Sequence, residues 1–288
     1  MDKDEVILKP WYDNMDDYDY GEMNSRLKRF EPEKEGKWVK PSPYLEGKSY
    51  RVPHRKIIDK NPPDFPEYSD GVYMWTLAEM TVAARLALRD ERPFAMRRDV
   101  YNASCRPWFE GQRKKGLKDV ALISSLVMPD HPELLGSQHA AMFCWYEDGT
   151  VSRVIISYDI NINRLIIDEM PLSDCNITKP VCPDNIYEFH EALLDTASVA
   201  PNEFWMDYFA SAAYMLESDK CTYDKQSDMF YLPDPYYKYM LAVGHSHMGG
   251  GMGSWNDTPI VDTWEFRIVN AELSYQKLRA MLYAVNNC

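Results

Sequence analysis

The segment "HAAMFCWYEDGTVSRVIISYDI", His139 to Ile160, decides the fold that the sequence predicts. Two runs rich in β-branched and aromatic residues flank Asp148-Gly149, a dipeptide suited to the positive φ angles of a type I′ hairpin turn. The run "NRLIIDEM", 163–170, follows closely and should add a third antiparallel strand. Upstream, "VALISSLVM", 120–128, is an apolar run of strand length. The sequence therefore predicts an antiparallel meander.

Helical periodicity appears on both sides of this meander. Apolar residues recur at helical spacing after Gly71 and again in the segments that follow the strands. Asp184 and Asn202 are expected to cap two of these helices, and Pro235 to open a third. The predicted helical segments are 72–90, 184–197, 203–217, 235–243 and 271–285. Strands followed by a run of helices indicate an α+β fold, an antiparallel β-meander packed with several α-helices.

The N-terminal quarter differs from the rest of the chain. Residues 1–70 mix charges, prolines and single aromatics without helical or strand periodicity, which predicts an extended acidic, proline-rich arm. Residues 71–288 are then expected to form the α+β globular domain. Within the arm, acidic and aromatic side chains alternate in a pattern that suits a partner-binding tail. The candidate protein-binding residues are Asp13, Asp16, Asp17, Tyr18, Asp19 and Tyr20.

The composition limits the partners to expect. Lysine and arginine total 32 against 45 acidic residues, a net charge of −13 at pH 7. This charge disfavours nucleic acid and anionic lipid and favours a basic protein partner. No apolar run is long enough to span a membrane, and the acidic N-terminus does not resemble a signal peptide, so a cytoplasmic location is expected. The six cysteines include no C-x-x-C pair and are expected to stay reduced. The one basic stretch, 97–118, is interpreted as a solvated face.

The glycine-rich stretch "AVGHSHMGGGMGSWNDTP", 242–259, is the part of the sequence that most resembles a site. A nucleophile elbow at Ser246 fails because Met248 stands where its second glycine belongs, and no histidine follows His247. A phosphate loop is weakly supported, because Ser254, Trp255 and Asn256 follow the glycines where that motif has lysine and then serine or threonine. His245 and His247 are candidate metal ligands, although two histidines on a glycine-rich loop give a metal little support.

A structural role for this stretch is the preferred interpretation. Gly244 is expected to end the preceding helix in the left-handed conformation, and later glycines to allow sharp turns. Trp255 should insert into the core, with Asn256 and Asp257 tying the turn. The predicted structural loop comprises Gly244, Gly250, Gly251, Gly253, Trp255, Asn256 and Asp257. No catalytic residue and no cofactor are predicted.

"GGMGSWND", 250–257, resembles a G-G-M-G-S-(W/F)-N-D motif of small uncharacterised bacterial proteins, some of which are immunity-protein-like. The resemblance covers the last 50 or so residues and supplies no catalytic residues. It implies, together with the acidic charge, a non-enzymatic protein-binding module of immunity or antitoxin type that blocks a basic toxin such as a nuclease. Two alternatives stay open: a metal-assisted enzyme with its site at His245 and His247, and a structural or phage accessory protein.

Overall fold

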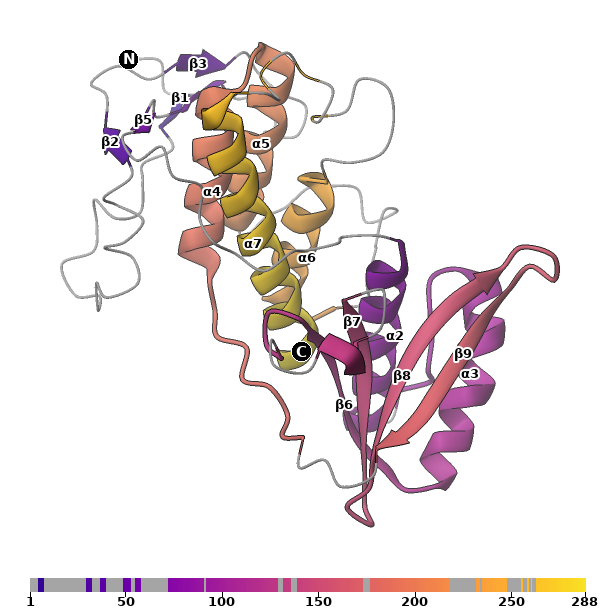
Figure 1. Cartoon of the computed structure of the whole chain (residues 1–288). Helices are drawn as coiled ribbons and strands as arrows, with labels where there is room; N and C mark the ends of the chain where they lie inside the picture. Colours follow the sequence, from indigo (N-terminus) through magenta and orange to yellow (C-terminus); the bar gives the residue numbers. More distant parts are fainter. Residues whose placement is uncertain are drawn as a thin grey trace. The chain divides into compact units, whose positions relative to one another are not determined.

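In the computed structural model, the chain folds into two compact units (Figure 1). The structure describes the backbone of five short strands within residues 1–71. From residue 72 onward it describes every residue except 91, 129–131, 136–138, 173–176, 218–231, 234, 248–254, 256–257, 259 and 261–262. The helical unit comprises Met1–Phe65, Asn185–Ser227 and Leu241–Ala280. The sheet unit comprises Pro66–Asp184, Asp228–Met240 and Met281–Cys288.

The sheet unit is built on the predicted meander. Its strands are β6 (Leu117–Ser124), β7 (Ala140–Tyr146), β8 (Val151–Asp159) and β9 (Arg164–Leu172). They form one antiparallel sheet in chain order, so β6 and β9 are its edges. All of the predicted strands are therefore confirmed.

The turn between β7 and β8 differs from the type I′ turn that the sequence predicted. Gly149 has a φ of +84°, whereas Asp148 does not adopt a positive φ. Tyr146 accepts a hydrogen bond from the Gly149 N–H at 3.1 Å and donates one to the Thr150 carbonyl at 3.0 Å. These bonds enclose a three-residue loop with its glycine in the left-handed region, a common alternative hairpin connection. The Asp148 carboxylate accepts the Thr150 N–H at 2.9 Å and its hydroxyl at 2.7 Å, which stabilises this loop.

Two helices cover one face of the sheet, α2 (Val72–Arg89) and α3 (Asp99–Lys114) (Figure 1). The sequence predicted α2 but not α3, which occupies much of the basic stretch. Its buried residues, Tyr101, Cys105, Phe109 and Gln112, recur at helical spacing. Pro107 lies inside the helix with its side chain exposed, where its missing N–H removes one helical hydrogen bond without blocking the packed face.

The opposite face of the sheet is covered at one end by the connection between β6 and β7. Five buried residues form the core of this layer, with partly buried side chains from the connection and from Ile177 packed around them. Trp145 donates an indole hydrogen bond to the Ile177 carbonyl at 2.9 Å. The buried members of this layer are Ile123, Leu135, Ala141, Phe143 and Val151.

The helical unit contains α4 (Ile186–Val199), α5 (Glu203–Glu217) and parts of two further helices. These are α6 (Tyr236–His245) and α7 (Trp264–Asn287), each of which contributes residues to both units. Together with the sheet they make the protein α+β, as predicted.

The helix starts confirm one predicted cap and correct another. Asn202 caps α5 as expected, because its side-chain oxygen accepts the Trp205 N–H at 3.1 Å. Asp184 does not cap α4: Asn185 occupies the N-cap, and the Asp184 carboxylate accepts the Tyr239 hydroxyl at 2.7 Å instead.

The last helix begins at Trp264, seven residues before the predicted start at Ala271. Thr263 caps it, since its hydroxyl oxygen accepts the Phe266 N–H at 3.2 Å. The prediction rested on the apolar pattern alone and overlooked the Thr263 cap, so it placed the start of the helix too late.

Five short strands are described within the predicted arm: β1 (Glu5–Ile7), β2 (Phe30–Pro32), β3 (Lys37–Val39), β4 (Ser49–Val52) and β5 (Arg55–Ile57). They form a sheet in the order β1-β4-β3, with β1 and β4 parallel, and a separate β2-β5 pair. The predicted boundary between an arm and a domain at residue 70 stays a prediction. Among the helices described, none has the length and apolar character needed to cross a membrane.

Candidate binding surface

The two histidines of the glycine-rich stretch occupy different environments. His245 is buried, and its ring stacks on Tyr208 at a centroid distance of 4.7 Å. Burial lowers the pKa of His245 to about 4, so its imidazole is neutral at physiological pH. His247 is exposed, and its backbone carbonyl accepts the Tyr208 hydroxyl at 2.9 Å. Among the described residues, no three histidine, cysteine or acidic side chains gather as a metal would require.

The helix before this stretch does not end at Gly244 as predicted. It continues through Gly244 to His245, and Gly244 does not adopt a positive φ. The Ser246 hydroxyl donates to the Ala242 carbonyl at 2.7 Å, which continues the helical turn beyond the glycine. Lys277, itself buried, donates to the Ser246 carbonyl at 3.1 Å. These contacts hold the end of α6 in place without a left-handed residue.

Trp255 is the predicted core anchor, and the structure confirms this. Its side chain is fully buried. The ring packs on Phe209 at 4.9 Å, on Phe266 at 5.3 Å and on Trp205 at 5.5 Å. The segment's indole therefore has a structural role in the helical unit. The other predicted loop residues, Gly250, Gly251, Gly253, Asn256 and Asp257, lie outside the described residues.

The helical unit also buries a histidine between two carboxylates. The His190 Nε2 lies 2.6 Å from the Glu217 carboxylate, and Nδ1 lies 3.4 Å from that of Glu191. Burial lowers the pKa of His190, but the hydrogen bonds and charges of Glu191 and Glu217 outweigh burial and raise it overall. The imidazole is fully buried, so a substrate cannot reach it. Its contact with Glu217 links α4 to the end of α5.

A second polar cluster lies between α3 and the sheet. The Glu169 carboxylate on β9 accepts four hydrogen bonds: from Gln112 Nε2 at 2.7 Å, Tyr146 Oη at 2.8 Å, Ser152 Oγ at 3.0 Å and Trp108 Nε1 at 3.2 Å. Four donors occupy the acceptor sites of a carboxylate, so Glu169 has no acceptor site left for a ligand. Burial, together with the neighbouring Glu169, raises the pKa of Tyr146. This cluster fixes α3 on the sheet.

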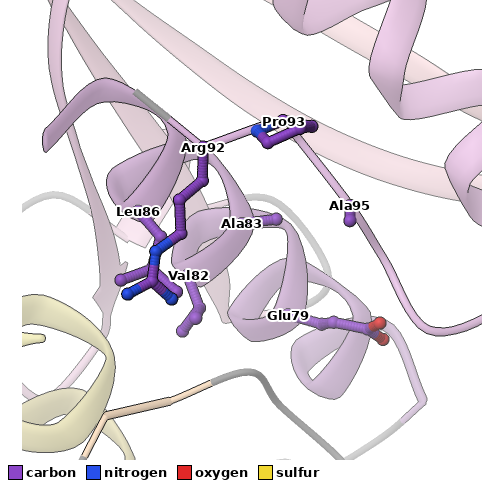
Figure 2. A pocket seen from close by; sticks show the side chains of 7 residues that line it. All are labelled: Glu79, Val82, Ala83, Leu86, Arg92, Pro93 and Ala95. Carbon is purple, nitrogen blue, oxygen red and sulfur yellow. The ribbon is translucent and has the colours of Figure 1, made fainter. Parts of the chain in front are cut away.

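A small pocket of about 280 Å³ lies between α2 and the segment that follows it (Figure 2). Its walls are mainly apolar. Glu79 accepts a hydrogen bond from the Arg97 backbone N–H, and burial raises the pKa of its carboxyl group. Arg92 forms an ion pair with Asp90 at 3.3 Å. The lining residues are Glu79, Val82, Ala83, Leu86, Arg92, Pro93 and Ala95, which include no nucleophile and one carboxylate, so the pocket lacks the groups for hydrolytic chemistry.

The most unusual surface is the hairpin of β8 and β9. Seven large apolar side chains are exposed among the described residues, and five of them belong to this hairpin. Their exposed fractions are 81% for Ile160, 55% for Ile162, 42% for Ile166, 39% for Met170 and 37% for Tyr158. We call these five residues the hairpin surface; Ile166 and Met170 share one face of the sheet, and Tyr158 lies on the other, where its ring meets Tyr101 of α3 at 6.4 Å. Scattered exposed apolar residues are ordinary, but a group of them on one element indicates a binding surface.

The hairpin surface was not predicted from the sequence. Isoleucine and methionine in a strand are usually core residues, so the run 163–170 predicted a strand without showing which face stays exposed. The hairpin surface could have been recognised from the turn, where Ile160 and Ile162 alternate with polar residues. The predicted protein-binding residues Asp13, Asp16, Asp17, Tyr18, Asp19 and Tyr20 lie outside the described residues. No protein-family model, curated protein or solved structure was found to match the chain.

Proposed function

We propose that this chain is a non-enzymatic, acidic protein-binding module of immunity or antitoxin type. The observation that carries the proposal is the hairpin surface, where five large apolar side chains share one β-hairpin. Such a surface supplies binding energy when a partner removes it from water, at about 25 cal/mol per Å² of apolar area. The polar clusters around His190 and Glu169 support the proposal, because their hydrogen bonds are directed inward.

The partner that fits the charge of the chain is a basic protein. The net charge of −13 attracts a positive surface and raises the rate of encounter, while the apolar contacts set the rate of dissociation. A toxin with a basic cleft, such as a nuclease, is the class of partner we infer. Because a surface charge acts over about 8 Å at physiological ionic strength, association should slow as salt is added.

A comparison of variants in the native host tests this proposal. Tagged wild-type protein should retain a basic protein, and the purified pair should associate more slowly at high salt. Replacing the two most exposed residues of the turn (Ile160→Ser with Ile162→Ser) should weaken binding at least about 10-fold. Val181→Ser is the matched control, since Val181 is 87% exposed and lies outside the hairpin. Deletion of residues 1–22 separately measures the contribution of the acidic tail.

Two results would contradict the proposal. Equal affinity of the wild type and the Ile160→Ser/Ile162→Ser variant would remove the hairpin from the binding surface. Retention of no protein, or of acidic proteins alone, would exclude the immunity type of function.

A further inference from the structure

The edge strand β9 carries two of the five residues of the hairpin surface, Ile166 and Met170, and is open along its outer side. Within the described part of the chain, β9 pairs with β8, and no side chain is hydrogen-bonded to its other edge. The opposite edge strand, β6, is closed: Asn286 accepts the Leu122 N–H and donates to the Leu122 carbonyl, both at 2.8 Å. An exposed edge with apolar side chains is a template for pairing with another strand.

The hydrogen bonds of Leu122 also fix which groups of β9 point outward. The N–H and C=O of one residue point to the same side of an antiparallel strand, and this direction alternates along the chain. The backbone N–H and C=O of Leu122 point away from β7, toward Asn286. The registers of the three strand pairs then set which backbone groups point outward on β7, β8 and β9. The outward backbone groups of β9 are therefore those of Leu165, Ile167 and Glu169.

We propose that β9 pairs with β9 of a second copy of this chain, antiparallel and with the twofold axis at Ile166. This goes beyond the proposed function but rests on the same hairpin, of which it uses the strand rather than the turn. In this register Leu165 of one copy and Ile167 of the other exchange backbone hydrogen bonds. The two sheets of four strands would become one continuous sheet.

The side chains of β9 select this register. In a twofold pair with its axis at Ile166, each Arg164 lies opposite Asp168 of the other copy, and the two Ile166 side chains face each other. With the axis at Ile167, Ile166 would oppose Asp168. With the axis at Asp168, two aspartates would face each other, which is unfavourable. Ile166 at the axis is thus the arrangement that joins opposite charges and apolar groups at once.

The exposed side chains supply the driving force. Ile166 and Met170 are 42% and 39% exposed, and both lie on the face of the sheet that α2 and α3 do not cover. Asp168 forms an ion pair with Arg153 at 3.9 Å, and because its side chain is still 65% exposed, a second copy can also reach it. Exposed ion pairs stabilise little, so Arg164 and Asp168 would set the register while the apolar contacts hold the strands together.

Site-directed crosslinking of the purified chain tests the register. Ile166→Cys and Asp168→Cys are introduced separately in a background where Cys175 and Cys221, the cysteines outside the described residues, are serine. Ile166 would form a pair without backbone hydrogen bonds, where Cα atoms lie about 4.5 Å apart, close enough for a disulfide. The two Asp168 positions would be four residues, about 14 Å, out of register, too far for a bond.

The expected result is a covalent dimer of Ile166→Cys under copper-phenanthroline oxidation, formed at least about 10-fold faster than with Asp168→Cys. Equal rates would indicate random collision, faster crosslinking of Asp168→Cys would indicate another register, and crosslinking of neither would indicate no pairing; each overturns the proposal. Sedimentation equilibrium of the wild type should show a mass approaching twice 33.6 kDa as concentration rises. The test uses one purified chain, so its failure leaves the binding of a basic partner intact, and the reverse also holds.

Discussion

The two edges of the four-stranded sheet show opposite solutions to the same physical problem. An edge strand exposes backbone groups that seek partners. On β6, Asn286 satisfies both groups of Leu122, and Arg85 donates to the Val120 carbonyl at 3.0 Å. On β9 no such side chain is present among the described residues, and apolar side chains lie exposed beside the open edge.

This difference teaches where to look for function when the described residues form no recognisable catalytic group. The closed edge is built from residues far apart in the sequence, since Asn286 and Leu122 are separated by 164 positions. Closing an edge in this way stabilises the fold. Leaving the other edge open forgoes that stability and exposes apolar surface, which natural proteins usually avoid unless a partner covers it.

The two faces of β9 itself should give the largest contrast. Replacing Glu169 by alanine leaves several buried donors without their acceptor, so the sheet unit should lose about 3 kcal/mol of unfolding free energy. Asp168→Ala, next to it on the exposed face, should change stability by less than about 0.5 kcal/mol. Urea unfolding of the two variants measures both values. If the two variants lost equal stability, the four hydrogen bonds of Glu169 would not hold α3 on the sheet.

The closed edge should give the next largest effect. Asn286→Ala leaves the N–H and the carbonyl of fully buried Leu122 unpaired, at a cost of about 2 kcal/mol. Asn287→Ala is the control: this neighbouring side chain is exposed and donates to the Cys182 and Tyr283 carbonyls, so its loss should cost under about 1 kcal/mol.

Amide hydrogen exchange localises this effect. The Leu122 amide should exchange faster in Asn286→Ala than in the wild type, while amides at the centre of β8 stay protected. Unchanged exchange at Leu122 would mean that the edge is closed by other contacts.

Local patterns in the sequence predicted most of the fold. The β-branched and aromatic runs around Asp148-Gly149 predicted the strands, and Asn202 predicted the start of α5, because these signals act over a few residues. The helix α3 was missed because Pro107 and the surrounding basic residues hid its buried face. The turn type was also wrong, since the carboxylate of Asp148 bonds to Thr150 and favours a different loop.

The candidate site could not be predicted in the same way. The environment of His245 depends on Tyr208, a residue of another helix, so the sequence could not show that burial lowers the pKa of this imidazole. The exposure of Ile166 likewise depends on which face of the sheet α2 and α3 cover. Trp255 was predictable as a core residue, since a tryptophan between polar residues and glycines has few other roles.

The open edge should give the smallest change in intrinsic stability. Ile166→Thr keeps a β-branched side chain on an exposed position, so at low concentration the unfolding free energy should change by at most about 0.5 kcal/mol. Its effect should appear through association instead.

If two copies pair through β9, dilution lowers the melting temperature of the wild type, because a partner that binds the folded state stabilises it by mass action. Ile166→Thr should weaken this dependence, and Val181→Thr should retain it in full. Melting curves over a 100-fold range of concentration measure the three proteins side by side. The same concentration dependence in all three would show that association does not involve β9, and the open edge would then differ from β6 in stability alone.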